Sequence, residues 1–230
     1  MKKKAPRELI FETLIEKSIV KKDVYKLATS VFSDFNAVAE EIAIDLKAKI
    51  TEIDPRLEIS YKEKGTGEFL LQIAGDVLVF ATHTNVFSFD KSHQLWNSSY
   101  LKEEPSRAYC AVIHIYNFLS DSYEFHRMDD IGYLIARIFI NKDKHYFVEG
   151  KRQLSFLYND FANAVINKED ITSIIESAIL YSMDFDLLTP PYDNVKQASV
   201  AEMQEWSKNL GNKTGKRLGF KFQADAGDIT

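Results

Sequence analysis

The apolar residues of this chain change their spacing twice, and these two changes restrict the fold more than any other feature. Residues 31–53 carry apolar side chains at helical spacing, residues 57–149 read as strands, and helical spacing returns after Gly150. Strands that follow one another through short turns pair antiparallel. We therefore expect the α+β class, with a mainly antiparallel sheet of about six strands flanked by N-terminal and C-terminal helices.

The first helical pattern is amphipathic. Its apolar face is formed by Val31, Phe35, Val38, Ile42, Leu46 and Ile53. Charged residues lie between these positions, as expected for a helix with one buried side. The helix should end before the Asp54-Pro55 pair, because a proline disfavours helical geometry at the residue before it. A shorter helical segment is expected ahead of it, over residues 8–25.

The middle of the chain predicts the order of the strands. Residues 57–62 alternate between apolar and polar, and Gly75-Asp76 is a hairpin signal between two apolar runs. Residues 109–118 and 131–140 are apolar on both faces, which indicates central strands. A polar turn over 141–144 leads into a last strand, and a symmetric hairpin would place Glu149 opposite Ala136.

After Gly150, helical spacing is expected again. The positions that carry it are Leu154, Leu157, Phe161 and Val165. Asn167 with Asp170, and Ser199 with Glu202, resemble capping boxes that begin two further helices. We expect one domain over residues 1–230, with a helical part at 1–54, the sheet at 55–150, a second helical part at 151–211 and a tail at 212–230.

Composition and charge narrow the functional classes. The chain has 34 acidic and 29 basic residues, and this formal charge of -5 does not favour binding to nucleic acid. Cys110 is the only cysteine, so we expect no intrachain disulfide and no structural zinc site, and its thiol fits a small buried apolar group. No run approaches the roughly 20 apolar residues that cross a bilayer, and Pro6 interrupts any signal peptide after the N-terminal lysines. We expect a cytoplasmic protein that does not enter the membrane.

One sequence motif suggests an enzyme. Glu149-Gly150-Lys151 ends a predicted strand, and Asp129-Asp130 precedes the strand before it. This resembles the signature of the restriction-endonuclease-like superfamily, and the resemblance covers about 25 residues, without the family's proline. It implies a Mg-dependent nuclease in which Asp130 and Glu149 bind Mg²⁺ and Lys151 positions water. The expected hairpin, however, holds Asp130 roughly 20 Å from Glu149 along the strand, too far to share one ion.

A second group of candidates lies inside the apolar strands. His83, His114, Asn117 and Arg137 are polar residues in predicted strands, and a buried polar group needs a partner. They could line one ligand pocket or be satisfied separately by local hydrogen bonds. Trp96 and Tyr100 lie in the polar loop between strands, where large aromatic residues form contacts or cover the sheet.

These observations favour a binding module over an enzyme. No catalytic set of residues is complete, whereas aromatic residues are frequent in the predicted sheet and its loop. We expect a non-catalytic module that binds a protein partner, a second copy of itself or a small ligand through His83, His114, Arg137, Trp96 and Tyr100, with no metal or cofactor. The alternative is the Mg-dependent nuclease, with Asp130, Glu149 and Lys151 as its catalytic residues.

Overall fold

A computed structural model gives the structure of the protein. It describes residues 5–128, 130–151, 154, 159–184, 186–187, 189, 191–201, 203–204 and 223–224. These form helices and a mainly antiparallel sheet, which confirms the α+β class. The expected second capping box and the tail lie outside the described residues, apart from Ser199 and the short strand Gln223–Ala224.

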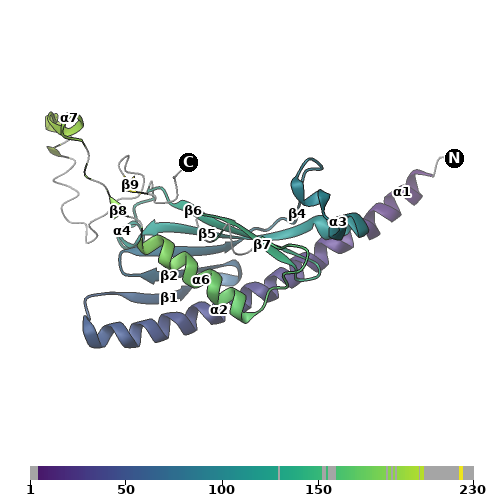
Figure 1. Ribbon diagram of the computed structural model, residues 1–230, viewed down its shortest axis with the longest axis horizontal. Coiled ribbons are helices and arrows are strands. Elements are labelled where there is room, and N and C mark those ends of the chain that lie inside the picture. The colour runs from purple at the N-terminus through teal and green to yellow at the C-terminus, as the bar shows by residue number, and fades with distance from the viewer. Residues whose placement is uncertain are drawn as a thin grey trace.

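The N-terminal helix is longer than the sequence pattern predicted. It consists of α1 (Pro6–Thr13), the π-helix η1 (Leu14–Ile19) and α2 (Val20–Ile53), and its segments follow one another directly. The two separate segments expected from the sequence are therefore one rod, which passes under the sheet and extends beyond it (Figure 1). The π-helix interrupts the regular helical spacing in the region where the sequence pattern is weakest.

The sheet has the strand order β1-β2-β3-β5-β6-β7, and the short β4 pairs with β5. Its strands are β1 (Ile59–Glu63), β2 (Glu68–Ile73), β3 (Asp76–Thr82), β4 (Phe87–Ser88), β5 (Tyr109–Leu119), β6 (Tyr133–Asn141) and β7 (Tyr146–Gly150). All of these pairings are antiparallel. The two strands expected to be central, β5 and β6, do have a neighbour on each side.

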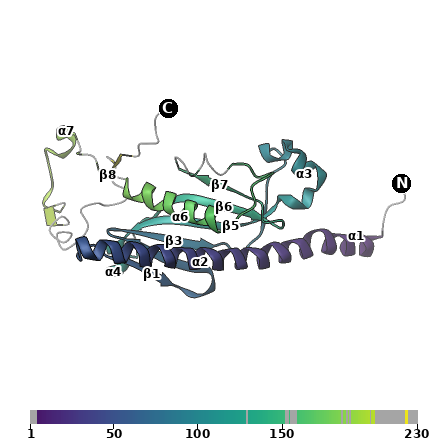
Figure 2. The ribbon, with the colours of Figure 1, turned by 60° about the horizontal axis from the view of Figure 1, so that its bottom comes forward.

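Two helices cover one face of the sheet. Helix α2 and helix α6 (Lys168–Met183) lie side by side there and share one apolar core with the strands (Figure 2). Phe69 and Phe80 stack at 4.5 Å between ring centroids, and Phe32 and Phe35 of α2 pack against them. Helix α6 begins with the expected capping box of Asn167 and Asp170.

Among the described residues, two segments partly cover the opposite face. At one end of β5 lies a lobe, which we define as residues 84–108 and which contains β4, η3 (Gln94–Asn97), α3 (Ser99–Glu103) and η4 (Pro105–Ala108). At the other end lies the short helix α4 (Ser120–Glu124) with the residues that follow it. The lobe lies at the first end of the 11-residue β5 and α4 lies at its last end, so the middle of this face is between them.

Two local expectations were wrong. Glu149 lies opposite Arg137, not Ala136, because the side chain of Asn141 accepts hydrogen bonds from the backbone of Asp143 and His145 and shortens the turn by one residue. Phe161 is not helical, and neither is Val165, which forms an isolated β-bridge with His145. Leu157 lies outside the described residues.

The stacked phenylalanines supply a test of this core. Phe80→Ala should lower the free energy of unfolding by about 3–5 kcal/mol, because it removes a fully buried ring and leaves a cavity. Phe125→Ala is the control, since this ring is 46% exposed and its loss should change stability by less than about 1 kcal/mol. Urea unfolding of both variants measures the difference.

Candidate functional site

Three of the predicted binding residues lie together in the middle of the sheet face that the helices leave uncovered. His114 on β5 pairs with Arg137 on β6, and Arg137 pairs with Glu149 on β7, so these two binding residues and Glu149, a residue of the nuclease alternative, form one transverse row. Cross-strand neighbours point to the same side of a sheet. Their face is the one opposite the shared core, because Ile113 and Ile115, the sequence neighbours of His114, belong to that core.

His83 joins this row from the end of β3. Its backbone N–H donates to Val112, which keeps it beside β5, and its ring centroid lies 6.1 Å from that of His114. The backbone N–H of Asn85 donates to Nδ1 of His83 at 3.0 Å, so the neutral ring carries its proton on Nε2. We call the side chains of His83, His114, Arg137 and Glu149 the open strip.

Arg137 and Glu149 form an ion pair inside the open strip. Nε of Arg137 donates to the Glu149 carboxylate at 2.8 Å, and a second guanidinium nitrogen donates to the same oxygen. Their side chains remain 42% and 46% exposed, so both can be reached from solvent. The pair leaves further guanidinium N–H groups for an acceptor, since Arg has five.

The electrostatics of the open strip favour an anion. Burial, followed by the nearby His83 and Arg137, lowers the pKa of His114 below its ordinary value. The two positively chargeable neighbours therefore oppose protonation of His114. A negatively charged group placed among these side chains would reverse that effect and raise the pKa.

A line of aromatic rings connects the open strip to a groove. Along the outer side of β5, the ring of His114 lies 5.9 Å from Tyr116, Tyr116 lies 6.5 Å from Phe118, and Phe118 lies 5.6 Å from Tyr123 of α4. Phe118 and Tyr123 line a groove of about 630 Å³ between β1, β2 and α4. Cavities of this size accept small molecules.

The lobe packs as a second apolar core. Trp96 is half-buried there, with its indole N–H donating to the backbone of Phe89 at 3.3 Å and the Lys91 ammonium 3.2 Å from its ring centroid. Phe139 and Phe147 of the sheet complete this core. Trp96 therefore helps to fix the lobe on the sheet, and its role as a ligand contact stays a prediction.

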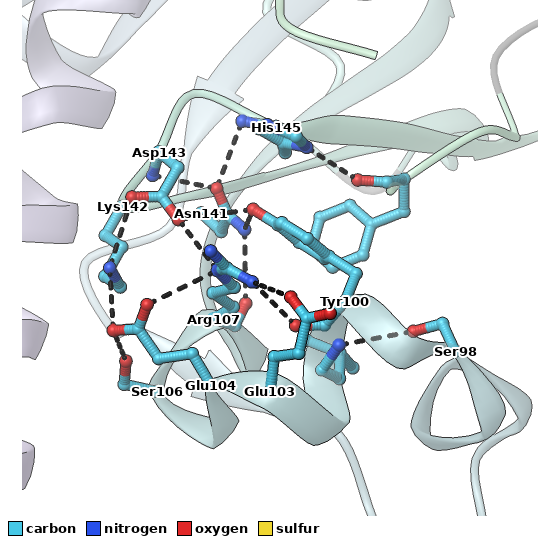
Figure 3. A network of polar contacts seen from close by, with 12 residues as sticks. Ser98, Tyr100, Glu103, Glu104, Ser106, Arg107, Asn141, Lys142, Asp143 and His145 are labelled. Atoms are coloured by element: carbon cyan, nitrogen blue, oxygen red, sulfur yellow. Dashed lines mark hydrogen bonds and ion pairs between the residues drawn. The ribbon is translucent and has the colours of Figure 1, made fainter. Parts of the chain in front are cut away.

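Tyr100 belongs to a polar network that fastens the lobe to the turn between β6 and β7 (Figure 3). Its ring lies between the His145 ring, at 4.6 Å, and the Arg107 guanidinium, at 4.2 Å. Its hydroxyl accepts a hydrogen bond from Nδ2 of Asn141 at 2.9 Å and lies 3.3 Å from the Asp143 carboxylate. Tyr100 therefore has a structural role, because it connects the lobe to the turn between β6 and β7.

Asn141 is the centre of this network. The side chain is fully buried, its amide oxygen accepts two backbone N–H groups of the turn, and its amide nitrogen donates to Tyr100 and to the backbone of Arg107. The pKa of Asp143 is raised by burial, but hydrogen bonds from Lys142, Tyr100 and Arg107 and the charge of Lys142 outweigh burial and hold it below its ordinary value. We call this network the joint. Its charged and polar side chains bond one another, and it connects the lobe to the turn between β6 and β7.

The residues of the nuclease alternative are placed separately. Asp130 accepts a hydrogen bond from Ser122 at 2.6 Å and pairs with Arg127, whereas Glu149 pairs with Arg137. Asp130 precedes β6, whose first residue, Tyr133, already lies about 13 Å along the strand from Arg137. Among the described residues, no three His, Cys, Asp or Glu side chains form a group suited to a metal ion.

Lys151 and Cys110 are not part of the open strip. Lys151 is exposed just after β7, and its backbone N–H donates to Ile135. Cys110 is fully buried beneath the lobe, and burial raises the pKa of its thiol, so the thiolate that a nucleophile requires is disfavoured.

Two further residues of this region were not among the predicted binding residues. Tyr116 and Phe87 contact the histidines of the open strip, with Phe87 4.7 Å from His83. Tyr116 could have been found, since it lies two residues after His114 and therefore on the same strand face. Phe87 could not, because its place depends on the pairing of the two-residue strand β4 with β5.

Comparisons with family models, curated proteins and solved structures found no match. None of the described helices is both long enough and apolar enough to cross a membrane. The function must therefore be argued from the geometry of the site.

Asn141 provides a test of the joint. Asn141→Ala should lower the free energy of unfolding by about 2–4 kcal/mol, because it leaves buried hydrogen-bonding groups of the turn and of Tyr100 without partners. Asn163→Ala is the matched control, since Asn163 is exposed and, among the described side chains, bonds Asp160 alone. Thermal and urea unfolding should separate the two variants, and equal stability losses would contradict the role of the joint.

The pKa of His114 provides a test of the open strip. Its folded-state pKa is lowered, so the unfolded chain takes up the proton first and the free energy of unfolding should fall as the pH drops below about 6.5. Arg137→Gln removes one of the charges that lower this pKa and should raise it. Titration of the histidine ring protons by NMR measures the change, and an unchanged or lower pKa in Arg137→Gln would contradict the electrostatic account.

Proposed function

We propose that the protein is a non-catalytic binding module whose ligand is an anion with an aromatic or apolar body. The observation that carries this proposal is the convergence of His83, His114 and Arg137 on one accessible strip. Two imidazoles and a guanidinium follow one another along this row, which has a single carboxylate, Glu149, at its end, and this excess of positively chargeable groups suits a carboxylate or a phosphate group.

The body of the ligand is inferred from the aromatic line. Rings that follow one another from His114 through Tyr116 to Phe118 offer stacking surfaces for an aromatic group. The groove at the end of this line is apolar on its floor, where Leu70 and Val77 are buried. The anionic group would bind at the open strip, and the apolar body would extend toward α4.

The lobe supports the site from one side. The joint at Asn141 and the Trp96 core hold the lobe against the sheet, which fixes Phe87 beside His83. A site whose walls are held by packing requires little ordering when a ligand binds. This gives Trp96 and Tyr100 a supporting role in the proposed binding module.

The test uses three probes of defined chemistry. 2-Naphthoate has both an anionic group and an aromatic body, naphthalene-2-carboxamide lacks the charge, and inorganic phosphate lacks the body. We expect 2-naphthoate to bind best, to shift the ring resonances of His83 and His114, and to raise the pKa of His114. Its affinity should increase as the pH falls from 8 to 6, because a protonated imidazole attracts the carboxylate.

Variants separate this site from unspecific binding. His114→Gln should weaken 2-naphthoate binding about tenfold and remove most of its pH dependence, whereas the matched control His93→Gln, at a half-buried histidine of the lobe outside both the open strip and the groove, should bind as the wild type does. Tyr116→Ala should weaken 2-naphthoate but leave phosphate unchanged. Equal binding of the acid and its amide would contradict the proposal, and so would Mg²⁺-dependent cleavage of DNA or RNA that EDTA and Glu149→Ala abolish.

A further inference from the structure

The N-terminal end of the long helix projects away from the sheet. Neither α1 nor η1 contains a buried residue, and continuous burial on the rod begins only at Val24. Both views show this end extending beyond the strands and the lobe (Figures 1 and 2). Yet it is apolar: Leu9, Ile10, Phe11, Leu14, Ile15 and Ile19 are between 46% and 65% exposed.

Every fourth residue of this segment forms one row. The row reads Arg7, Phe11, Ile15, Ile19 and Asp23. In a regular α-helix, steps of four residues drift by about 40° each, so a row of this length would wind around the helix. The π-helix over Leu14–Ile19 turns more slowly and opposes that drift, which keeps the row on one side.

The row has the symmetry of a self-complementary surface. Read in the opposite direction it becomes Asp23, Ile19, Ile15, Phe11 and Arg7, so an antiparallel copy centred on Ile15 places a cation opposite an anion at both ends. Phe11 then faces Ile19, and Ile15 faces Ile15. A surface that matches its own copy in this way is the pattern of a twofold dimer.

We propose that a second copy of this chain binds here, in an antiparallel helix pair with Ile15 on the twofold axis. The antiparallel direction follows from charge, because a parallel pair would set Arg7 against Arg7 and Asp23 against Asp23. It also follows from shape: the sheet lies beside α2 and away from α1 (Figure 2), so an antiparallel pair sets its two sheets at opposite ends. Exposed apolar patches of this kind mark association surfaces in proteins.

A groove beside the helix extends the interface. Ile15 and Val20 line one wall of a groove of about 700 Å³, and Trp96, Pro105 and Tyr109 line the lobe side. In the antiparallel pair, the Phe11 end of the second copy lies opposite Ile19, next to Val20. The groove therefore receives the tip of the partner helix, which joins the row and the lobe into one surface.

The first experiment measures the oligomeric state of the full chain by sedimentation velocity. The wild type should be a dimer, and Ile15→Asp should raise the dissociation constant at least a hundredfold, because it places two carboxylates together on the axis. Ile44→Asp is the matched control, since Ile44 is a 64% exposed isoleucine on the same rod outside the row, and it should stay dimeric. A monomeric wild type, or equal effects of both variants, would overturn the proposal.

Charge reversal tests the direction of the helices without placing a charge in the apolar surface. Arg7→Asp and Asp23→Arg should each raise the dissociation constant several-fold, since each sets like charges opposite one another at both ends. The double variant should restore it, because the pairing is merely exchanged. Failure of the double variant to recover would overturn the antiparallel arrangement.

Cysteine cross-linking gives an independent measurement. A mixture of Phe11→Cys and Ile19→Cys chains should form a disulfide dimer under mild oxidation, whereas Phe11→Cys alone should not. The native Cys110 is buried and does not interfere. Cross-linking of Phe11→Cys alone, at the rate of the mixture, would establish a parallel pair and overturn the proposal.

Discussion

The packing of α2 against the sheet is the interaction on which the rest of the structure depends. Phe32 and Phe35 contact the stacked pair Phe69 and Phe80, and α6 completes the same core. Because both helices cover one face, the described segments on the other face are shorter and cover its ends only. The open strip exists because the large helices share a side.

This division also explains the placement of the polar residues. His114 and Arg137 are tolerated in apolar strands because alternate side chains of a strand point to opposite faces, and theirs is the uncovered one. Asn141, by contrast, is fully buried, and it is tolerated because each of its side-chain hydrogen-bonding groups has a partner. Asn117 of β5 and Asp76 of β3 are also buried, and there Asn117 donates a hydrogen bond to the Asp76 carboxylate. Accessible and enclosed polar groups of this sheet are thus tolerated for different physical reasons.

Much of the fold could be predicted from local spacing. The alternation of Ile59 and Tyr61, the hairpin at Gly75 and the capping box at Asn167 depend on neighbouring residues, and the structure confirms each. The expected turn Gly75-Asp76 is shifted by one residue, because the turn is Ala74-Gly75 and Asp76 already belongs to β3. The register of the last hairpin could not be predicted in this way, because it depends on the hydrogen bonds between the Asn141 side chain and the backbone of the turn. Phe161 shows the opposite error: its helical spacing is coincidental, and its ring belongs to the lobe core.

The candidate site was predictable only as a set of residues. The sequence singled out His83, His114 and Arg137, but their meeting required the long-range pairing of β3 with β5 and of β5 with β6. The boundary of the N-terminal helix was missed because the π-helix breaks the regular period that the sequence reading relied on.

The π-helix also has a consequence for how one rod can serve two surfaces. It offsets the phase of the apolar pattern by part of a turn, so the segment before it presents its side chains independently of the segment that packs on the sheet. Changes upstream of Leu14 can then alter the outer surface without disturbing the inner one. The segment before the π-helix and the segment after it can therefore change in sequence independently of each other.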